Sequence, residues 1–472
     1  MFRYLPLLLL SLATVAVAED APWATFRGNA QRTGNTDGKA GPSAVPQLEW
    51  AMKSDEHFVA SPVPSGDSVL FSAIGAFNRP NVLALAASPK DAKAVKPTWN
   101  KTAPFLRLPT VSSPAVIGDK IIFGEGMHQT DGAVLYCLPA DGGFLLWALN
   151  VPGELVHMEG SPAISEGKVY VGGGSAGVMC VDLNTLTLNG KELGIKDIPA
   201  LQADHWKSLQ VKYEADKKKD PDFAIPPTED QLLKPAPKVV WTQGKTKWHI
   251  DAPILVAGDK VLAASAYLDK EKLGERALFC LDAATGKEVW KAPLTLNPWG
   301  GPSVMGDTVI VTTSSISYDP KLLDGAKGEV IAIDLKTGKE KWKKNIPGGV
   351  LGCACLTKDA AIFTATDGKL RTFSLTDGAR VSIYDCKAPV FAPPAVVGTI
   401  AYVPDLKGVL HAVDTKTGLA VWTLDLGKDP VKLPGMNYGG VTVHGGKIYL
   451  GTCNLEGDFA RQPTAAMCLG GK

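Results

Sequence analysis

The stretch that decides the fold is Val330-Ile-Ala-Ile-Asp-Leu-Lys-Thr-Gly-Lys-Glu-Lys-Trp342. It has the pattern of a strand, a turn at Thr-Gly, and a second strand that ends in tryptophan. Close copies are Leu278-Phe-Cys-Leu-Asp-Ala-Ala-Thr-Gly-Lys-Glu-Val-Trp290 and Leu410-His-Ala-Val-Asp-Thr-Lys-Thr-Gly-Leu-Ala-Val-Trp422. A unit this short cannot bury its own apolar face, so the copies must stack on one another.

The repeat can be counted at a small residue on the first strand and an aromatic residue on the second. The small residues are Ala84, Cys137, Cys180, Cys280, Ala332, Thr372, Ala412 and Cys468. The aromatic residues are Trp50, Trp99, Trp147, Trp241, Trp290, Trp342, Tyr384 and Trp422. Trp50 precedes every small residue, and Cys468 follows every aromatic one. This offset predicts a closed ring in which the strand of Trp50 completes the blade of Cys468.

Turns of the Gly-Asp or Gly-Lys type lead into short, alternating apolar strands between the copies. Examples are Gly118-Asp-Lys-Ile-Ile-Phe and Gly306-Asp-Thr-Val-Ile-Val. Such strands and turns are typical of an all-β fold, and a period of about 40 to 53 residues suits one four-stranded propeller blade. We therefore predict a single domain over residues 19–472: an eight-bladed β-propeller of four-stranded antiparallel blades, closed by the N-terminal strand.

Residues 1–18 have the pattern of a signal peptide. A short basic start, Met1-Phe-Arg, is followed by an apolar run, and Ala16-Val-Ala18 forms a small-x-small cleavage site. The run is too short to span a membrane, and no cysteine follows it as a lipid acceptor. We expect an exported protein, periplasmic or extracellular, with no membrane span and no lipid anchor. The net charge of +1 and the absence of a basic stripe argue against a nucleic-acid partner.

One insertion, at residues 190–240, interrupts the repeat within the third blade, where a hairpin needs far fewer residues. Its residues from Ile198 to Glu214 are expected to form a short amphipathic helix. The residues at helical spacing are Leu201, His205, Leu209 and Tyr213. Two interpretations remain: a docking arm for a partner, or a solvated decoration of the outer blade edge. The many charges of both signs favour the second.

The eight cysteines fall into two groups. Four of them occupy the small position of the repeat, where other blades carry Ala or Thr, so we expect buried fillers that lie too far apart to bridge. The other four are Cys353, Cys355, Cys386 and Cys453. Cys353 and Cys355 lack a second pair of ligands for a metal site. A disulfide between Cys353 and Cys386 is the one pairing that we consider, and its state stays open.

The Asp-x-x-Thr-Gly-x-x-x-Trp pattern resembles the repeat of the quinoprotein, or PQQ-like, propeller superfamily, and the resemblance covers nearly all of residues 19–472. The opening Trp23-Ala-Thr-Phe-Arg-Gly-Asn with Arg32-Thr-Gly34 is similar to the N-terminal segment of exported members. The resemblance implies that the tryptophan of each blade packs against the neighbouring blade. The superfamily includes PQQ-dependent dehydrogenases and the BamB-type scaffold of outer-membrane protein assembly.

The resemblance to the dehydrogenases does not extend to the residues that bind their cofactor and Ca²⁺. Those enzymes carry an adjacent pair of cysteines beside the cofactor, whereas the nearest feature here is Cys353-Ala-Cys355. They also hold Ca²⁺ through carboxylate and amide oxygens, and no such set aligns with this chain. Trp299 and His249 are weak candidates for contacting PQQ. We predict no cofactor, with PQQ and Ca²⁺ expected only if the chain is a dehydrogenase.

The mouth of the central channel is the expected binding site, because polar residues from several blades converge there. The residues just before the inner strands are His57, Thr110, His157, His249, Asn297 and Asn437. A histidine triad can bind a metal, but we expect loop histidines that face water and predict no metal site. A second polar cluster consists of Glu125, His128 and Asp131 in one loop.

The formal match of Gly173-Gly-Ser-Ala-Gly177 to Gly-x-Ser-x-Gly joins two predicted strands, not a strand and a helix, so we interpret it as a hairpin. Two function classes remain. The favoured one is an exported, non-catalytic propeller that acts as a binding or scaffold module in the cell envelope, with a protein or glycan partner. The alternative is a PQQ-dependent quinoprotein oxidoreductase.

Overall fold

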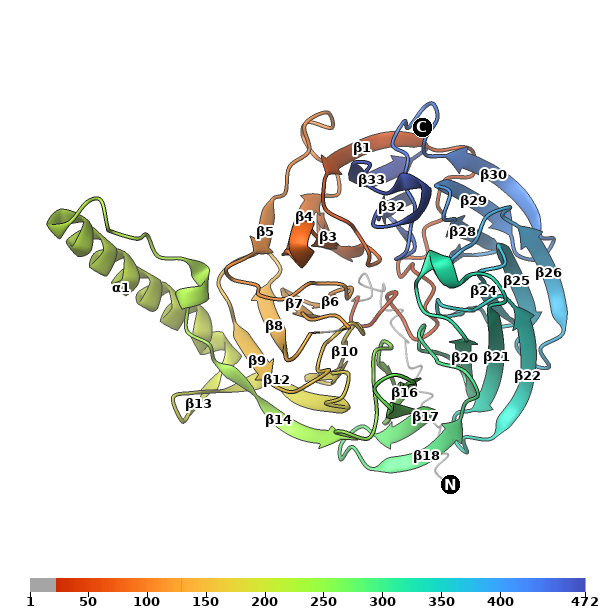
Figure 1. Ribbon diagram of the computed structural model, residues 1–472, viewed down its shortest axis with the longest axis horizontal. Helices are drawn as coiled ribbons and strands as arrows, with labels where there is room; N and C mark the ends of the chain where they lie inside the picture. Colours follow the sequence, from red (N-terminus) through yellow and green to blue (C-terminus); the bar gives the residue numbers. More distant parts are fainter. Residues whose placement is uncertain (1–22, 129, 472) are drawn as a thin grey trace, which may run out of the picture.

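The computed structural model describes residues 23–128 and 130–471, so the signal peptide assigned to residues 1–18 lies outside the described part. Eight antiparallel sheets of these residues stand like blades around a central axis (Figure 1). Seven sheets have four strands, and the third has five because β12 pairs with both β13 and β14. The predicted eight-bladed β-propeller is confirmed.

The first four blades follow one another along the chain. Blade one contains β2 Val63–Ser65, β3 Ser68–Ile74, β4 Pro80–Ala86 and β5 Trp99–Thr102. Blade two contains β6 Ala115–Ile117, β7 Lys120–Gly124, β8 Ala133–Pro139 and β9 Trp147–Val151. Blade three contains β10 Ala163–Ser165, β11 Lys168–Gly172, β12 Val178–Leu188, β13 Lys191–Gly194 and β14 Ala236–Gln243. Blade four contains β15 Leu255–Ala257, β16 Lys260–Leu268, β17 Leu273–Asp282 and β18 Glu288–Pro293.

The last four blades complete the ring. Blade five contains β19 Pro302–Met305, β20 Thr308–Ser314, β21 Lys327–Asp334 and β22 Glu340–Pro347. Blade six contains β23 Cys355–Leu356, β24 Ala360–Thr364, β25 Lys369–Ser374 and β26 Arg380–Asp385. Blade seven contains β27 Ala395–Val397, β28 Ile400–Pro404, β29 Val409–Asp414 and β30 Leu419–Asp425. Blade eight contains β31 Thr442–His444, β32 Lys447–Gly451, β33 Thr464–Gly470 and, from the other end of the chain, β1 Gln47–Ser54.

The ring closes as the offset of the two repeat positions predicts. Strand β1 pairs antiparallel with β33 and places Trp50 opposite Cys468. Two segments far apart in the sequence therefore share one blade (Figure 1). Closure in this way leaves no open end of the ring at which another chain could add strands.

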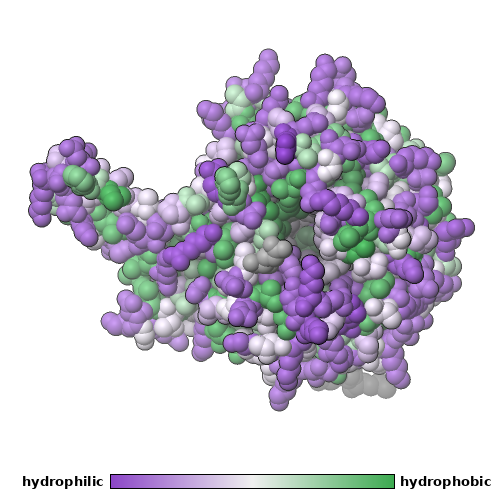
Figure 2. Space-filling model, viewed as in Figure 1, coloured by the Kyte–Doolittle hydropathy of each residue, from purple (hydrophilic) through white to green (hydrophobic). Residues whose placement is uncertain are grey.

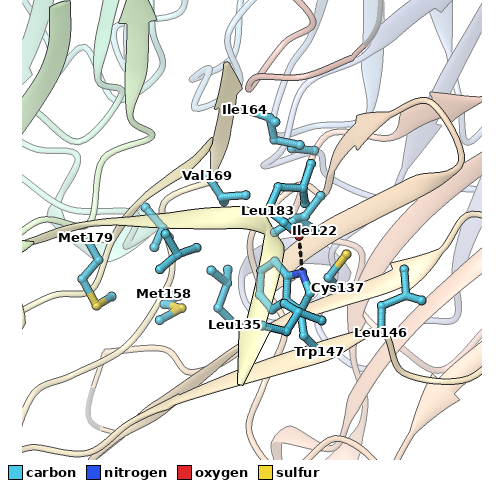
Figure 3. Packing of buried hydrophobic residues seen from close by; sticks show 14 of the residues in the cluster. Ile122, Leu135, Cys137, Leu146, Trp147, Met158, Ile164, Val169, Met179 and Leu183 are labelled. Atoms are coloured by element: carbon cyan, nitrogen blue, oxygen red, sulfur yellow. Dashed lines mark hydrogen bonds between the residues drawn. The ribbon is translucent and has the colours of Figure 1, made fainter. Parts of the chain in front are cut away.

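In seven of the eight blades, the tryptophan of the outer strand hydrogen-bonds to the neighbouring blade. In Figure 3, Trp147 of β9 is packed among apolar side chains of blades two and three, and its Nε1 donates a hydrogen bond of 3.1 Å to the carbonyl oxygen of Leu183. The equivalent bonds run from Trp50 to Ala87, Trp99 to Ala140, Trp241 to Ala283, Trp290 to Leu335, Trp342 to Leu375 and Trp422 to Pro42. A buried indole needs a partner for its N–H, and the neighbouring blade supplies it.

Blade six departs from this rule. The residue opposite Thr372 is Ser382, not Tyr384, so the assignment of Tyr384 to the aromatic position is wrong by two residues. The Ser382 hydroxyl donates the equivalent bond to the carbonyl oxygen of Thr415 in blade seven. The Tyr384 hydroxyl reaches blade seven from another position, through the ring of His411 at 3.0 Å.

All eight cysteines are buried and free, including the four at the small position of the repeat. The disulfide considered between Cys353 and Cys386 is not formed. Cys386 packs with Cys355 in an apolar cluster of blades six and seven to which Cys353 does not belong. The Cys355 thiol contacts the carbonyl oxygens of Arg32 and Pro394 at 2.8 and 2.9 Å.

Residues 23–35 form an axial plug that joins all eight blades. Six of its carbonyl oxygens, between Trp23 and Gly34, accept hydrogen bonds from inner strands. The donors are the N–H groups of Val116, Ile164, Val304, Leu356, Val396 and Val443, in blades two, three, five, six, seven and eight. Arg27 reaches Ser61 before blade one, and Arg32 reaches Ile254 before blade four. The motif from Trp23 to Gly34 is therefore the segment that hydrogen-bonds to all eight blades.

The two arginines of the plug are fully buried. Arg27 donates to the carbonyl oxygens of Val441 at 2.8 Å and Pro394 at 2.6 Å. Arg32 donates to four oxygens, among them the carbonyl of Pro302. Burial lowers the pKa of Arg32 to about 10, which still leaves it charged at neutral pH. The carbonyl dipoles of several blades thus take the place of a carboxylate partner.

The insertion of blade three is an arm that projects from the rim of the ring (Figure 1). Its helix, α1 Ile198–Lys219, has 22 residues and a length of about 33 Å, and it ends five residues beyond the expected Glu214. The base of the arm is part of the blade: Gln202 is buried, and its amide donates to the carbonyl oxygens of Leu145 and Leu233. Strand β14 begins at Ala236, so the last residues assigned to the insertion are a strand of the propeller.

Short 3₁₀ turns occur at Ala76–Asn78, Ile195–Asp197, Glu229–Gln231, Pro320–Leu322 and Gly457–Phe459. No helix in the described part of the chain is long and apolar enough to cross a membrane.

Candidate functional site

The face of the ring is hollowed at its centre, inside a rim of mostly hydrophilic side chains (Figure 2). Three neighbouring connections meet here and form what we call the mouth cluster: His128, His157, His249 and Asp251. His128 lies between β7 and β8, His157 between β9 and β10, and the other two between β14 and β15. Blades two, three and four therefore contribute to one group of side chains.

Local backbone structure holds these connections against one another. Ile250 makes an isolated antiparallel bridge with Gly174, with both N–H to carbonyl bonds at 3.1 Å. Gly174 has φ of +56°, and a Cβ there would lie 2.4 Å from the carbonyl oxygen of Leu155 and 3.1 Å from the ring of His157. Only glycine therefore allows the hairpin of residues 173–177 to approach His157 this closely.

That hairpin joins β11 and β12, as its sequence context predicts. The hydroxyl of Ser175 donates to the carbonyl oxygen of Glu154 at 2.6 Å, and the residue is 8% exposed. A serine nucleophile needs an adjacent general base, and this hydroxyl is bonded to backbone. The Gly-x-Ser-x-Gly match serves packing around the mouth cluster.

Asp251 lies at the centre of the mouth cluster. Its Oδ1 is 2.9 Å from Nε2 of His157, its Oδ2 is 2.9 Å from Nε2 of His249, and its side chain is 7% exposed. The three imidazole centroids lie 5.1 to 5.9 Å apart. One ligand atom from each of the four residues falls within 4.8 Å of all the others. The four side chains could therefore share one ion.

Opposing effects set the charges of the cluster. Burial disfavours ionisation of Asp251, but the adjacent His249 and His157 lower its pKa overall. Burial disfavours protonation of His157, yet the hydrogen bond and charge of Asp251 raise its pKa overall. Burial, together with the neighbouring histidines, lowers the pKa of His128. Asp251 is thus ionised at neutral pH, within a group of imidazoles.

Glu159 adds a second carboxyl group beside the cluster. It accepts a hydrogen bond from the backbone N–H of His128. Burial and the charge of Asp251 raise the pKa of Glu159 to about 7. The pKa values of the two neighbouring carboxyl groups are therefore shifted in opposite directions, because two like charges in a confined space disfavour each other.

Several nitrogen atoms of the cluster find no hydrogen-bond partner among the described residues. They are Nδ1 of His157 and both ring nitrogens of His249, all buried. The 2.9 Å approach of His249 Nε2 to Asp251 Oδ2 does not have the geometry of a hydrogen bond. Buried polar atoms without partners are rare in proteins and point to a missing atom at that place.

The structure divides the six residues expected at the channel mouth. His157 and His249 come together in the mouth cluster. The other four make side-chain hydrogen bonds outside the mouth cluster; they are His57, Thr110, Asn297 and Asn437. For example, Thr110 is fully buried and donates to the carbonyl oxygens of Ala73 and Asn81. The histidine triad is therefore completed by His128, not by His57.

The second expected cluster is dispersed as well. Only His128 faces the mouth cluster. Glu125 is fully buried and accepts from the N–H groups of Arg107 and Leu108, while Asp131 is exposed and accepts from that of Leu155. Our prediction of no metal site did not anticipate a grouping of three histidines and a carboxylate.

The sequence analysis missed Asp251 and Glu159, although a signal was present. His157-Met-Glu159 and His249-Ile-Asp251 repeat a His-x-acid pattern at the same place, just before the inner strands β10 and β15. Because equivalent positions of adjacent blades approach one another at the axis, a shared pattern there predicts a shared site. Arg27 and Arg32 were quoted only within a family motif.

The mouth residues do not fit the quinone cofactor that some members of the superfamily bind. Trp299, the candidate floor for PQQ, packs against an apolar cluster that includes Leu351 and Phe391, and its Nε1 donates to the carbonyl oxygen of Ile316. Cys353 and Cys355 are separated and buried. A histidine-rich donor set is also unsuited to Ca²⁺, which prefers oxygen ligands.

Comparisons with known proteins agree with this fold. A family model described as the outer membrane protein assembly factor BamB matches residues 46–205, 233–382, 276–429 and 366–458. No curated protein matches the chain by sequence. Among solved structures, BamB from Moraxella catarrhalis is 16% identical, with a TM-score of 0.57, over 91% of this chain and 98% of that one.

Two redox enzymes share the fold to a similar degree. A europium-containing methanol dehydrogenase is 13% identical, with a TM-score of 0.61, over 96% of this chain and 98% of that one. The quinohemoprotein alcohol dehydrogenase from Comamonas testosteroni is 13% identical, with a TM-score of 0.59, over 96% of this chain and 81% of that one. At these identities the likeness concerns architecture alone.

Proposed function

The chain belongs to the family of the outer membrane protein assembly factor BamB, and on this premise we propose that it is an exported, non-catalytic propeller that binds a partner protein in the cell envelope. The signal-peptide pattern of residues 1–18 supports export to the periplasm. We propose a protein as the partner without naming it, because family membership supports a binding role and does not identify what is bound.

The observation that carries this proposal is the use of Trp299. Trp299, the candidate for contacting PQQ, is partly buried, packs against apolar side chains and donates its Nε1–H to the carbonyl oxygen of Ile316. Tight cofactor binding requires specific donors at fixed positions. The use of Trp299 in packing and in a backbone hydrogen bond supports a binding role over redox catalysis.

The arm offers a surface suited to a protein partner. Phe223 and Ile225, on the segment that returns from α1, are 81% and 82% exposed, and Val211 of α1 is 64% exposed. Together with Leu209 and Tyr213, the two residues of the returning segment line a shallow groove at the outer end of the arm. Apolar side chains lie among the hydrophilic ones at this end (Figure 2). Clustered exposed apolar groups mark interaction surfaces.

Cofactor binding is the first test of this proposal. The purified protein is mixed with PQQ and Ca²⁺, and binding is followed by absorbance and equilibrium dialysis. We expect no saturable binding below the micromolar range, which corresponds to about −8 kcal/mol, and no dye reduction with alcohols or sugars. Stoichiometric PQQ binding with substrate-dependent turnover would instead establish the quinoprotein oxidoreductase.

Site-directed photocrosslinking in intact cells is the second test. A photoreactive amino acid replaces Phe223 in one variant and Val421 in a matched control, since Val421 is also exposed, at 45%, but lies on the outer strand β30. We expect one discrete protein adduct from position 223 and none from position 421. Equal, diffuse labelling from both positions would remove the support that the arm gives to the proposal.

A further inference from the structure

The donor chemistry of the mouth cluster is that of a transition-metal site. It offers three imidazoles and one carboxylate, with one ligand atom from each within 4.8 Å of the others. Imidazole nitrogen suits Zn²⁺, Cu²⁺ and Ni²⁺, whereas Mg²⁺ and Ca²⁺ select sites built from oxygen atoms. Four ligands at Zn²⁺ bond lengths of about 2.0 to 2.1 Å in a tetrahedron lie about 3.3 Å apart. The four ligand atoms of the cluster lie within 4.8 Å of one another, so small side-chain shifts would bring them to that spacing.

The contact between His249 and Asp251 favours a cation more directly. Nε2 of His249 is 2.9 Å from Oδ2 of Asp251, yet neither ring nitrogen of His249 has a hydrogen-bond partner among the described residues. The residue is fully buried, so water does not supply the missing bond at its surface. The two atoms lie close to each other but off the line of a well-formed hydrogen bond, an arrangement that a cation bound to both would satisfy.

The charge balance leads to the same conclusion. In the described part of the chain, Asp251 has ion-pair contacts only with His157 and His249, and no lysine or arginine reaches it. By contrast, the half-buried Asp367 of blade six is paired with Arg371. Buried charges in proteins are paired or coordinate metals: the buried Asp405 is paired with His411 alone, whereas Asp251 faces two imidazoles. A divalent ion at the mouth cluster supplies a compensating charge.

We propose that His128, His157, His249 and Asp251 bind one divalent transition-metal ion of the Zn²⁺ type. The four protein ligands fill a tetrahedral site and leave no position for a reactive water, which is the pattern of structural and not of catalytic zinc. The ion joins connections of blades two, three and four. It therefore fixes the position of the β7–β8 loop, whose Gly126 already packs against the backbone of His157.

Metal binding to the full mature chain is measured after treatment with a chelator. Isothermal titration with Zn²⁺ is expected to give one site per chain with submicromolar affinity, and Ca²⁺ or Mg²⁺ is expected to give none. The melting temperature should rise on addition of Zn²⁺, because a ligand that binds only the folded state stabilises it. Absence of Zn²⁺ binding by the wild-type protein would overturn the proposal.

Two variants remove ligands, and one serves as the matched control. His249→Ala and Asp251→Asn should each weaken Zn²⁺ binding by at least about 100-fold, since even outer-shell changes cost about 10- to 100-fold. His57→Ala removes a histidine that precedes an inner strand but lies outside the cluster, and it should bind Zn²⁺ as the wild type does. Unchanged affinity in both ligand variants would contradict the assignment of these residues.

A measurement on the unaltered protein covers the case in which a variant fails to fold. Co²⁺ replaces Zn²⁺, and the visible absorption of the complex is recorded. A four-coordinate Co²⁺ ion absorbs strongly in the visible region and a six-coordinate ion weakly. Strong absorption that Zn²⁺ abolishes supports the site, and a weak band shows that the closed four-ligand site is wrong. None of these measurements involves the partner protein, so they succeed or fail independently of the proposed function.

Discussion

The axial plug and the mouth cluster both place buried polar side chains near the centre of the ring, but they differ in how those side chains are satisfied. In the plug, Arg27 and Arg32 together donate seven hydrogen bonds to neighbouring oxygens, and of their guanidinium nitrogens Nε of Arg27 alone has no partner among the described residues. In the mouth cluster, both ring nitrogens of His249 have no partner among the described residues. A satisfied buried network stabilises a fold, whereas an unsatisfied one costs stability and persists where a ligand completes it.

The largest effect is expected from removing the plug. A chain that begins at residue 46 keeps strand β1 but loses the six carbonyl acceptors and both buried arginines. Each hydrogen bond contributes about 0.5 to 1.5 kcal/mol net, so the combined loss is of the order of the whole stability of a domain, about 5 to 15 kcal/mol. We expect no cooperative thermal transition. A melting curve like that of residues 19–472 would show that the blades hold the ring without the plug.

Single substitutions compare the two regions directly. Arg32→Ala leaves buried carbonyl oxygens of three segments without a donor and should cost about 3 to 5 kcal/mol in the free energy of unfolding. His249→Ala, in chelator-treated protein, removes a ring whose nitrogens have no partners and should cost about 1 to 2 kcal/mol, mainly through the cavity that it leaves. Urea denaturation measures both changes. An equal loss in the two variants would mean that the mouth cluster is as structural as the plug.

The plug and the mouth cluster also show which features could be predicted from the sequence and which could not. The eight blades and their closure followed from a repeat whose turns and strands are local, and the pairing of Trp50 with Cys468 followed from the phase of that repeat. Ser382 shows the limit of the method, because a serine that makes the bond of a tryptophan leaves no aromatic signal. The plug was seen as a motif only, since its hydrogen bonds join residues hundreds of positions apart.

The mouth cluster was predicted in part for a related reason. Position before an inner strand identified His157 and His249, but the same position in other blades selected residues that bond outside the cluster, such as Thr110. His128 lies in a hairpin loop, outside that register, so only the folded chain brings it to the other two. The grouping of these side chains depends on which connections meet in the folded chain, and the sequence alone does not contain it.

A smaller effect concerns Glu125, which lies in the loop that leads to His128. Burial raises the pKa of Glu125, although the N–H groups of Arg107 and Leu108 oppose the rise. The pKa of Glu125 is higher in the folded than in the unfolded protein, so ionisation of Glu125 lowers the free energy of unfolding. This loss is absent below the unfolded pKa and is complete once the pH has risen through the folded pKa. Glu125→Gln should therefore match the wild type near pH 4 and exceed its stability at pH 8, by about 1 kcal/mol or less.

Urea denaturation of both proteins at the two pH values gives the required difference, and the other carboxyl groups cancel in it. A variant that is less stable than the wild type at pH 8 would show that the ionised carboxylate is favoured in the fold. Glu125 would then resemble the satisfied groups of the plug, despite its one oxygen without a partner among the described residues.

The smallest effect is expected in the arm, which belongs to neither region. Replacing residues 207–227 by a short Gly-Ser linker removes the outer part of α1 and the exposed Phe223, and it keeps the packed base of the arm. The melting temperature should be unchanged, because the deleted backbone is exposed and makes few contacts with the blades. Removing the larger segment from Lys191 to Lys238 is expected to destabilise blade three instead. That deletion takes away β13, the buried Gln202 and the start of β14. If both deletions melt with the wild type, the base of the arm contributes nothing to the ring.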